Sequence, residues 1–129
     1  MKKAIFERQH DEHLIVIDCK VHSHKVLLAL DTGATHTTID LAALIIAGYS
    51  VADSIREVDI ETASGVIKGY VFLVERFTAI DTFLTNVEIC AYDFFTQQLA
   101  YDFDGVLGLD FFEGVKFCVD MGKGEITIH

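Results

Sequence analysis

The chain has 129 residues, of which 51% are hydrophobic and 23% charged, a composition that predicts one folded domain spanning residues 1–129 and not a disordered segment. Twenty acidic side chains outnumber ten basic ones and give a formal net charge of −10. Such a field repels phosphate backbones and anionic lipid headgroups, which argues against nucleic acid and against a membrane surface as partners.

Two apolar segments near the start of the chain predict a β-hairpin. Leu14–Val21 is rich in β-branched residues, and the apolar pattern resumes at Val26–Leu30 after the polar segment 22–25. The second strand of this hairpin runs directly into Asp31.

A short helix is predicted over Leu41–Ala47, since the segment Thr37–Asp40 supplies hydroxyl and carboxylate caps before it and Gly48 follows it. Further along, Val58–Thr62 and Val66–Val74 alternate in polarity on either side of a tight polar turn. They predict a second hairpin, one that projects from the body of the protein.

The remainder of the chain predicts more strands. One covers Phe83–Tyr92, and a closing pair covers Val115–Val119 and Glu125–His129, joined through the polar segment 120–124. Many short strands with one or two brief helices are typical of a mainly β, closed-barrel domain.

The chemically suggestive segment is Asp31-Thr32-Gly33-Ala34, which follows an apolar strand. A carboxylate delivered into a turn in this way can be held in place and still reach a substrate. Gly33 permits a close approach that a Cβ would block, and the hydroxyl of Thr32 can hold the loop against a neighbour. The alternative is an ordinary β-turn, because Asp, Thr and Gly are common turn residues.

Over nearly its whole length the chain resembles the retropepsin-like family of aspartic proteases. Three segments match in the order that the family has them: the apolar strand and active-site loop at Leu27–Thr35, the flap hairpin centred on Thr62, Ala63, Ser64 and Gly65, and the segment Gly105–Phe112 that includes Val106, Leu107 and Gly108. The resemblance implies that Asp31 is catalytic, that Thr32, Gly33 and Ala34 support its loop, and that the late segment braces this loop. It also implies the acid-protease β-barrel.

One catalytic aspartate implies two chains. Peptide hydrolysis needs one group to accept a proton from water and another to donate one. Two carboxylates about 3 Å apart share a proton, a rule known from the aspartic-protease dyad itself. The chain has no second Asp-Thr-Gly or Asp-Ser-Gly, so we expect a two-fold homodimer that brings two Asp31 carboxylates together. Asp110 is expected to cap a helix that begins near Phe111, and Glu125–His129 to be a candidate strand of the dimer sheet.

The predicted function is therefore that of an aspartic endopeptidase, a hydrolase acting in proteolysis on a peptide or protein substrate and needing no cofactor. The alternative is a catalytically silent module that dimerises or binds peptides, because a fold does not guarantee a function. The intact Asp31, Thr32 and Gly33 favour the enzyme.

A metal site is the weaker alternative reading of the histidines. His22 and His24 would share one face of a strand, with His10, His13 and Cys19 nearby in the sequence. A solvated hairpin turn over residues 22–25 is the favoured explanation, so no metal is expected.

The location is predicted to be cytoplasmic. Charged residues interrupt the apolar stretch that a secretion signal needs within the first fifteen positions, and the longest apolar run, Leu41–Ala47, is too short to span a bilayer. Three widely spaced cysteines in apolar stretches are typical of reduced thiols in a protein core.

Overall fold

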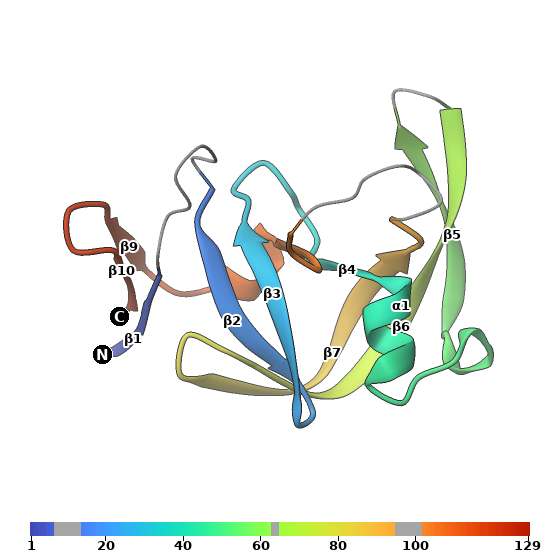
Figure 1. Ribbon diagram of the computed structural model, residues 1–129, viewed down its shortest axis with the longest axis horizontal. Coiled ribbons are helices and arrows are strands. Elements are labelled where there is room, and N and C mark those ends of the chain that lie inside the picture. Colours follow the sequence, from blue (N-terminus) through green and yellow to red (C-terminus); the bar gives the residue numbers. More distant parts are fainter. Residues whose placement is uncertain (7–13, 63–64, 95–101) are drawn as a thin grey trace.

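The computed structural model describes residues 1–6, 14–62, 65–94 and 102–129 (Figure 1). Its elements in chain order are β1 (Lys2–Ile5), β2 (Val16–Val21), β3 (His24–Leu30), β4 (Thr38–Asp40), α1 (Leu41–Ile46), the 3-10 helix η1 (Val51–Asp53), β5 (Arg56–Thr62), β6 (Gly65–Ala79), β7 (Thr82–Tyr92), β8 (Gly105–Leu107), the 3-10 helix η2 (Leu109–Phe112), β9 (Phe117–Asp120) and β10 (Glu125–Ile128).

Six strands close into a barrel. Seven strands are hydrogen-bonded in the order β2-β3-β8-β4-β7-β6-β5, and a further pairing of β2 with β6 closes the first six of them into a ring. That closing contact is short, with Lys20 opposite Thr78 and Val21 opposite Phe77. Strand β5 remains outside the ring, and among the described strands it pairs with β6. The closed, mainly β barrel predicted from the sequence is confirmed.

The predicted projecting hairpin is formed by β5 and the first half of β6. The two strands pair without interruption from Arg56 opposite Val71 to Thr62 opposite Gly65. Strand β6 is fifteen residues long, five residues longer at its C-terminal end than the segment predicted from the sequence, and it continues into the barrel beside β7. Figure 1 shows the hairpin rising from the barrel as an arm. Residues 63–64, at its turn, lie outside the described ranges.

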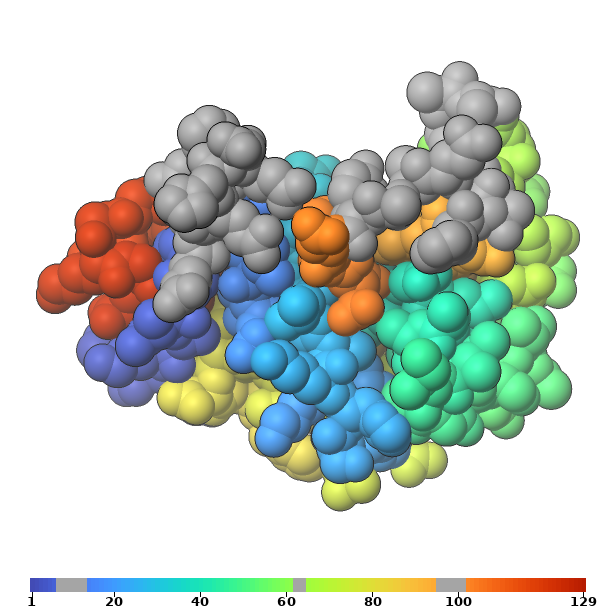
Figure 2. Space-filling view, viewed as in Figure 1, coloured from blue at the N-terminus to red at the C-terminus, as the bar shows by residue number. Residues whose placement is uncertain are grey.

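A second, three-stranded sheet has the order β1-β10-β9. The predicted closing pair is present as β9 and β10, with Ile126 opposite Val119. Strand β1 was not predicted, and it pairs along β10 with Ala4 opposite Ile126. Both edges of β10 are therefore used within the chain. This sheet and the β5–β6 arm lie at opposite ends of the long axis (Figure 2).

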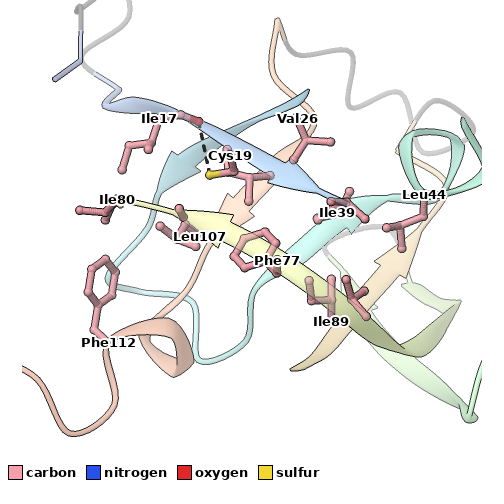
Figure 3. Packing of buried hydrophobic residues seen from close by; sticks show 14 of the residues in the cluster. Ile17, Cys19, Val26, Ile39, Leu44, Phe77, Ile80, Ile89, Leu107 and Phe112 are labelled. Atoms are coloured by element: carbon pink, nitrogen blue, oxygen red, sulfur yellow. Dashed lines mark hydrogen bonds between the residues drawn. The ribbon is translucent and has the colours of Figure 1, made fainter. Parts of the chain in front are cut away.

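The core fills the barrel with side chains from strands far apart in the sequence. The side chains of Ile17, Ile39, Phe77, Ile89 and Leu107 are all at most 2% exposed, and Figure 3 shows them converging from five different strands. Burial of such apolar area is the main favourable term in the stability of the fold.

The three cysteines differ in how deeply they are buried. Cys19 is buried and donates its thiol to the carbonyl oxygen of Ile17 at 3.6 Å, whereas Cys90 is half-buried and Cys118 exposed. All three are free thiols. The expectation of core thiols thus holds for Cys19 and is wrong for Cys118, because Cys118 lies on the outward side of the short strand β9.

Helix α1 begins and ends close to the prediction, but its start is not capped as expected. Asp40 occupies the N-cap position and makes no side-chain capping hydrogen bond. Its carboxylate instead accepts the backbone N–H of Phe94 at 3.1 Å. At the other end Gly48 adopts φ +109°, a conformation that suits glycine after a helix. Among the described residues no helix is long and apolar enough to cross a membrane.

Candidate active site

The Asp31 loop begins where β3 and β8 run side by side. The two strands are parallel, with Leu30 opposite Leu107. The ladder extends one step beyond β3, because the backbone N–H of Asp31 donates to the carbonyl oxygen of Leu107 at 3.1 Å. Asp31 therefore leaves the barrel at a defined point, and its side chain is exposed.

Within the loop, the carboxylate of Asp31 is tied to the backbone that follows it. Gly33 donates its N–H to Oδ1 of Asp31 at 2.9 Å, and Ala34 donates its N–H to the carbonyl oxygen of Asp31 at 3.1 Å. A Cβ at Gly33 would lie 3.1 Å from the same Oδ1. Glycine therefore allows the chain to turn closely around the carboxylate.

The segment after β8 packs directly on this loop. A Cβ at Gly108 would lie 2.7 Å from the carbonyl carbon of His36 and 2.9 Å from the carbonyl oxygen of Ala34, so only glycine fits there without a shift of backbone. The next residue, Leu109, donates its N–H to the carbonyl oxygen of Ala34 at 2.8 Å. Val106, Leu107 and Gly108 thus lie beside the loop that carries Asp31.

A buried threonine connects the two segments. Thr37 is 4% exposed, and its Oγ1 accepts the N–H of Gly108 at 3.1 Å and donates to Oδ1 of Asp110 at 2.8 Å. Its backbone N–H lies 3.0 Å from both carboxylate oxygens of Asp110. Because each of these groups has a partner, the end of the loop is held by a satisfied polar network.

The role predicted for Asp110 is wrong. The helix expected near Phe111 begins at Leu109, with Gly108 as N-cap and no side-chain capping hydrogen bond. The carboxylate of Asp110 instead accepts hydrogen bonds from the backbone N–H and the hydroxyl of Thr37. From the sequence Thr37 was expected only within the segment that caps the helix at Leu41–Ala47, and its contacts with Gly108 and Asp110 were not predicted.

A pocket lies at the base of the β5–β6 arm. It has a volume of about 660 Å³, within the usual range of ligand pockets. Its walls come from β5, β6, β7, the loop after Asp31 and η2. The lining residues with polar or ionisable side chains include His36, Thr37, Arg56, Asp59, Glu88, Cys90 and Asp110. Of the predicted flap residues, Thr62 and Gly65 are cross-strand partners, while Ala63 and Ser64 lie outside the described residues.

His22, one of the histidines considered as a metal ligand, has other partners. Arg76 donates its Nε–H to Nδ1 of His22 at 3.3 Å, and Nε2 of His22 lies 2.7 Å from the hydroxyl of Tyr49. The thiol of Cys19 is bonded inside the barrel. In the described ranges no group of three or more His, Cys, Asp or Glu side chains is placed to hold a metal. His10 and His13 lie outside those ranges.

Comparisons with known proteins agree with this arrangement. The model of a family described as aspartyl protease matches residues 17–111, from β2 to η2. A retropepsin-like aspartic protease from Rickettsia conorii has a similar structure, with a TM-score of 0.73 and 20% sequence identity over 100% of this chain and 99% of that one. The predicted retropepsin-like fold is therefore confirmed. Among curated proteins no match was found.

Proposed function

Because the chain belongs to the aspartyl protease family, we propose that it is an aspartic endopeptidase that works as a homodimer through the Asp31 carboxylates of its two copies. The observation that carries this proposal is the geometry of the Asp31 loop. The carboxylate is exposed, yet one oxygen is fixed by the N–H of Gly33 and the loop is braced by Gly108 and Leu109. A structural turn has no need of such bracing around an exposed carboxylate.

The reaction follows from two carboxylates that share one proton. The ionised carboxylate accepts a proton from a water molecule as the water oxygen attacks the peptide carbonyl carbon. The protonated partner donates its proton to the carbonyl oxygen, which gives a neutral tetrahedral diol. Transfer of a proton to the nitrogen then lets the C–N bond break, so that one new carboxyl group and one amine leave.

Both carboxylates must come from Asp31 in this proposal, since the sequence contains one Asp-Thr-Gly. A two-fold axis close to Asp31 supplies the second copy, as in isologous dimers. Thr32 is exposed next to it and is available for a hydrogen bond to the partner loop. The barrel, the β5–β6 arm and the β1-β10-β9 sheet act as one domain. The β5–β6 arm is the flap, which covers a bound peptide and excludes water.

The second candidate is a module that keeps the barrel and binds peptides without cleaving them. The pocket at the base of the flap supports peptide binding in either case, whereas the fixed carboxylate favours the enzyme. The two are separated by one experiment. Wild type and Asp31→Asn are incubated with a diverse peptide library from acidic to neutral pH, and the products are identified by mass spectrometry.

We expect cleavage by wild type alone, with Asp31→Asn folded and dimeric by circular dichroism and sedimentation. The asparagine cannot ionise, so the dyad never reaches its singly charged state. Equal cleavage by both proteins would exclude Asp31 as a catalytic residue. Binding without cleavage by both would favour the silent module.

A further inference from the structure

The pocket at the base of the flap has one wall on a continuous face of the β5–β6–β7 sheet. Directly paired residues in a sheet point to the same side, and Arg56 pairs with Val71, which pairs with Cys90. These three residues all line the pocket. Alternation along β5 adds Val58 and Ile60 to the same face.

The opposite wall belongs to the active-site region. His36 and Thr37 come from the loop that starts at Asp31, and Asp110 and Phe111 come from η2, which braces that loop. The pocket is therefore bounded by the flap strand on one side and by the active-site loop on the other. A peptide bound between the flap strand and the active-site loop would lie next to this pocket.

Most of the pocket is apolar. Its floor and sides are formed by aliphatic and aromatic residues: Val58, Ile60, Val71, Phe77, Leu84, Val87, Ile89 and Phe111. Such a surface favours a long side chain with several methylene groups. It does not by itself distinguish between an apolar end and a charged one.

The charged groups of the pocket make that distinction. Arg56 donates from Nη1 to Oε1 of Glu88 at 2.6 Å, and the two side chains are 54% and 52% exposed. Glu88 thus neutralises much of the charge of Arg56. Asp110 accepts hydrogen bonds from Thr37, which is neutral, so its negative charge has no cation as a partner among the described residues. With Asp59, which lies opposite Lys68 in the β5–β6 pairing, three carboxylates and one guanidinium line the pocket. The net charge of the chain is −10.

The pKa of the Cys90 thiol shows that these charges lie near the pocket wall. Burial raises the pKa of this thiol, the charge of Asp110 raises this pKa further, and Arg56 opposes the rise. Since Cys90 lines the pocket, Asp110 and the Arg56–Glu88 pair are all close enough to this part of its wall to act on the thiol.

We propose that this pocket binds a lysine or arginine side chain of the peptide substrate, with the methylene stem on the apolar floor and the cationic end between Glu88 and Asp110. The inference rests on the proposed function, because the bound side chain is part of a peptide to be cleaved. A glutamate in the same place would meet two carboxylates. A purely apolar side chain would fill the floor but desolvate the carboxylates without a partner.

The test compares substrates that differ in one side chain. Starting from any peptide that wild type cleaves, each position on both sides of the scissile bond is occupied in turn by Lys, Met or Glu, and kcat/KM is measured. We expect one position at which Lys exceeds Met by about three- to fivefold, as for a half-exposed charge pair, and Met exceeds Glu. No such position in the whole series would overturn the inference.

Two variants of the ion pair give opposite expectations. Glu88→Gln removes a carboxylate and releases Arg56, so the preference for Lys at that position should fall to about the level of Met. Arg56→Gln releases Glu88, so the same preference should rise. If the ion pair had only a structural role, both substitutions would change the preference for Lys over Met in the same direction. That result would contradict the proposal.

A matched control separates the pocket from net charge. Lys25 forms a similar exposed pair with Asp18 at 3.4 Å, and neither of these residues lines the pocket. Lys25→Gln changes net charge as Arg56→Gln does. It should leave the Lys preference unchanged, and an equal rise in both variants would contradict a local site.

Binding measured without cleavage keeps this inference apart from the proposed function. Asp31→Asn is titrated with the fluorescently labelled Lys, Met and Glu peptides, and anisotropy is recorded at low and high salt. Stronger binding of the Lys peptide, weakened by salt, supports the pocket even if wild type cleaves nothing. Cleavage by wild type with equal binding of all three peptides overturns the pocket and leaves the protease.

Discussion

Thr37 donates both its backbone N–H and its hydroxyl to the carboxylate of Asp110, at 3.0 and 2.8 Å, across 73 residues of sequence. The same hydroxyl accepts the N–H of Gly108. This contact is the polar link between the end of the Asp31 loop and the segment after β8. Asp110 therefore holds the end of the loop in position.

Removal of Asp110 tests this link. Asp110→Ala leaves the buried donors of Thr37 without an acceptor, which should cost about 1–3 kcal/mol in the free energy of unfolding and lower kcat. Asp110→Asn keeps one acceptor oxygen and should recover most of both losses. Urea unfolding and steady-state kinetics measure them. If alanine and asparagine behave alike, the hydrogen bonds to Thr37 do not position the loop.

A methyl group at Gly108 should disturb the same region by contact. Its Cβ would lie 2.7 Å from the carbonyl carbon of His36, so Gly108→Ala forces the backbone apart and should destabilise the fold by about 1–3 kcal/mol. Gly122→Ala is the control, because the nearest atom there, Oδ1 of Asp120, is 3.4 Å away. Thermal unfolding compares the two, and a neutral Gly108→Ala would mean that the loop tolerates displacement.

The proposed dimer predicts an effect at Leu109. This side chain is 42% exposed beside the Asp31 loop, where a two-fold axis through the active site would pass nearby. Leu109→Asp should shift the equilibrium toward monomer and lower activity at low protein concentration. Leu73→Asp, with the same exposed fraction in β6, should not. Sedimentation velocity over a concentration series decides, and a dimer unchanged by Leu109→Asp would place the interface elsewhere.

The thiols should differ in reactivity and in their effect on stability. Burial, with a smaller contribution from Asp18, raises the pKa of Cys19 to about 12 from its ordinary 9.0. A neutral thiol reacts slowly, so alkylation near pH 8 should modify Cys118 first and Cys19 only on unfolding. Mass spectrometry after timed quenching identifies the order.

The same shift in pKa has a consequence for pH. In the unfolded chain Cys19 ionises above its ordinary pKa of 9.0, whereas in the folded protein it stays neutral until about pH 12. The thiol therefore contributes stability below pH 9 that is lost between pH 9 and 12. Cys19→Ala should show a smaller fall in unfolding free energy over this range. Identical falls in both proteins would assign the change to other groups.

Local patterns were sufficient for the elements whose signal lies within a few residues. Alternating side chains predicted both hairpins, the closing strand pair and β7. Helix α1 followed from its apolar run before Gly48. In each of these cases the deciding interaction is short in sequence, so the residue types themselves carry it. The Asp31 loop was assigned from its Asp-Thr-Gly together with the resemblance of three separated segments to the retropepsin-like family.

Tertiary structure alone decided the rest. Strands β4 and β8 have three residues each, too few for any periodicity, and exist because neighbouring strands complete their hydrogen bonds. Strand β1 depends in the same way on β10 at the far end of the chain. Asp110 was expected to cap its own helix, the nearest use for a carboxylate, but the folded chain brings Thr37 closer. The pocket between Arg56, Glu88 and Asp110 likewise needs three strands and a helix in place. Contacts between residues distant in sequence are set by packing and loop closure, which no local pattern encodes.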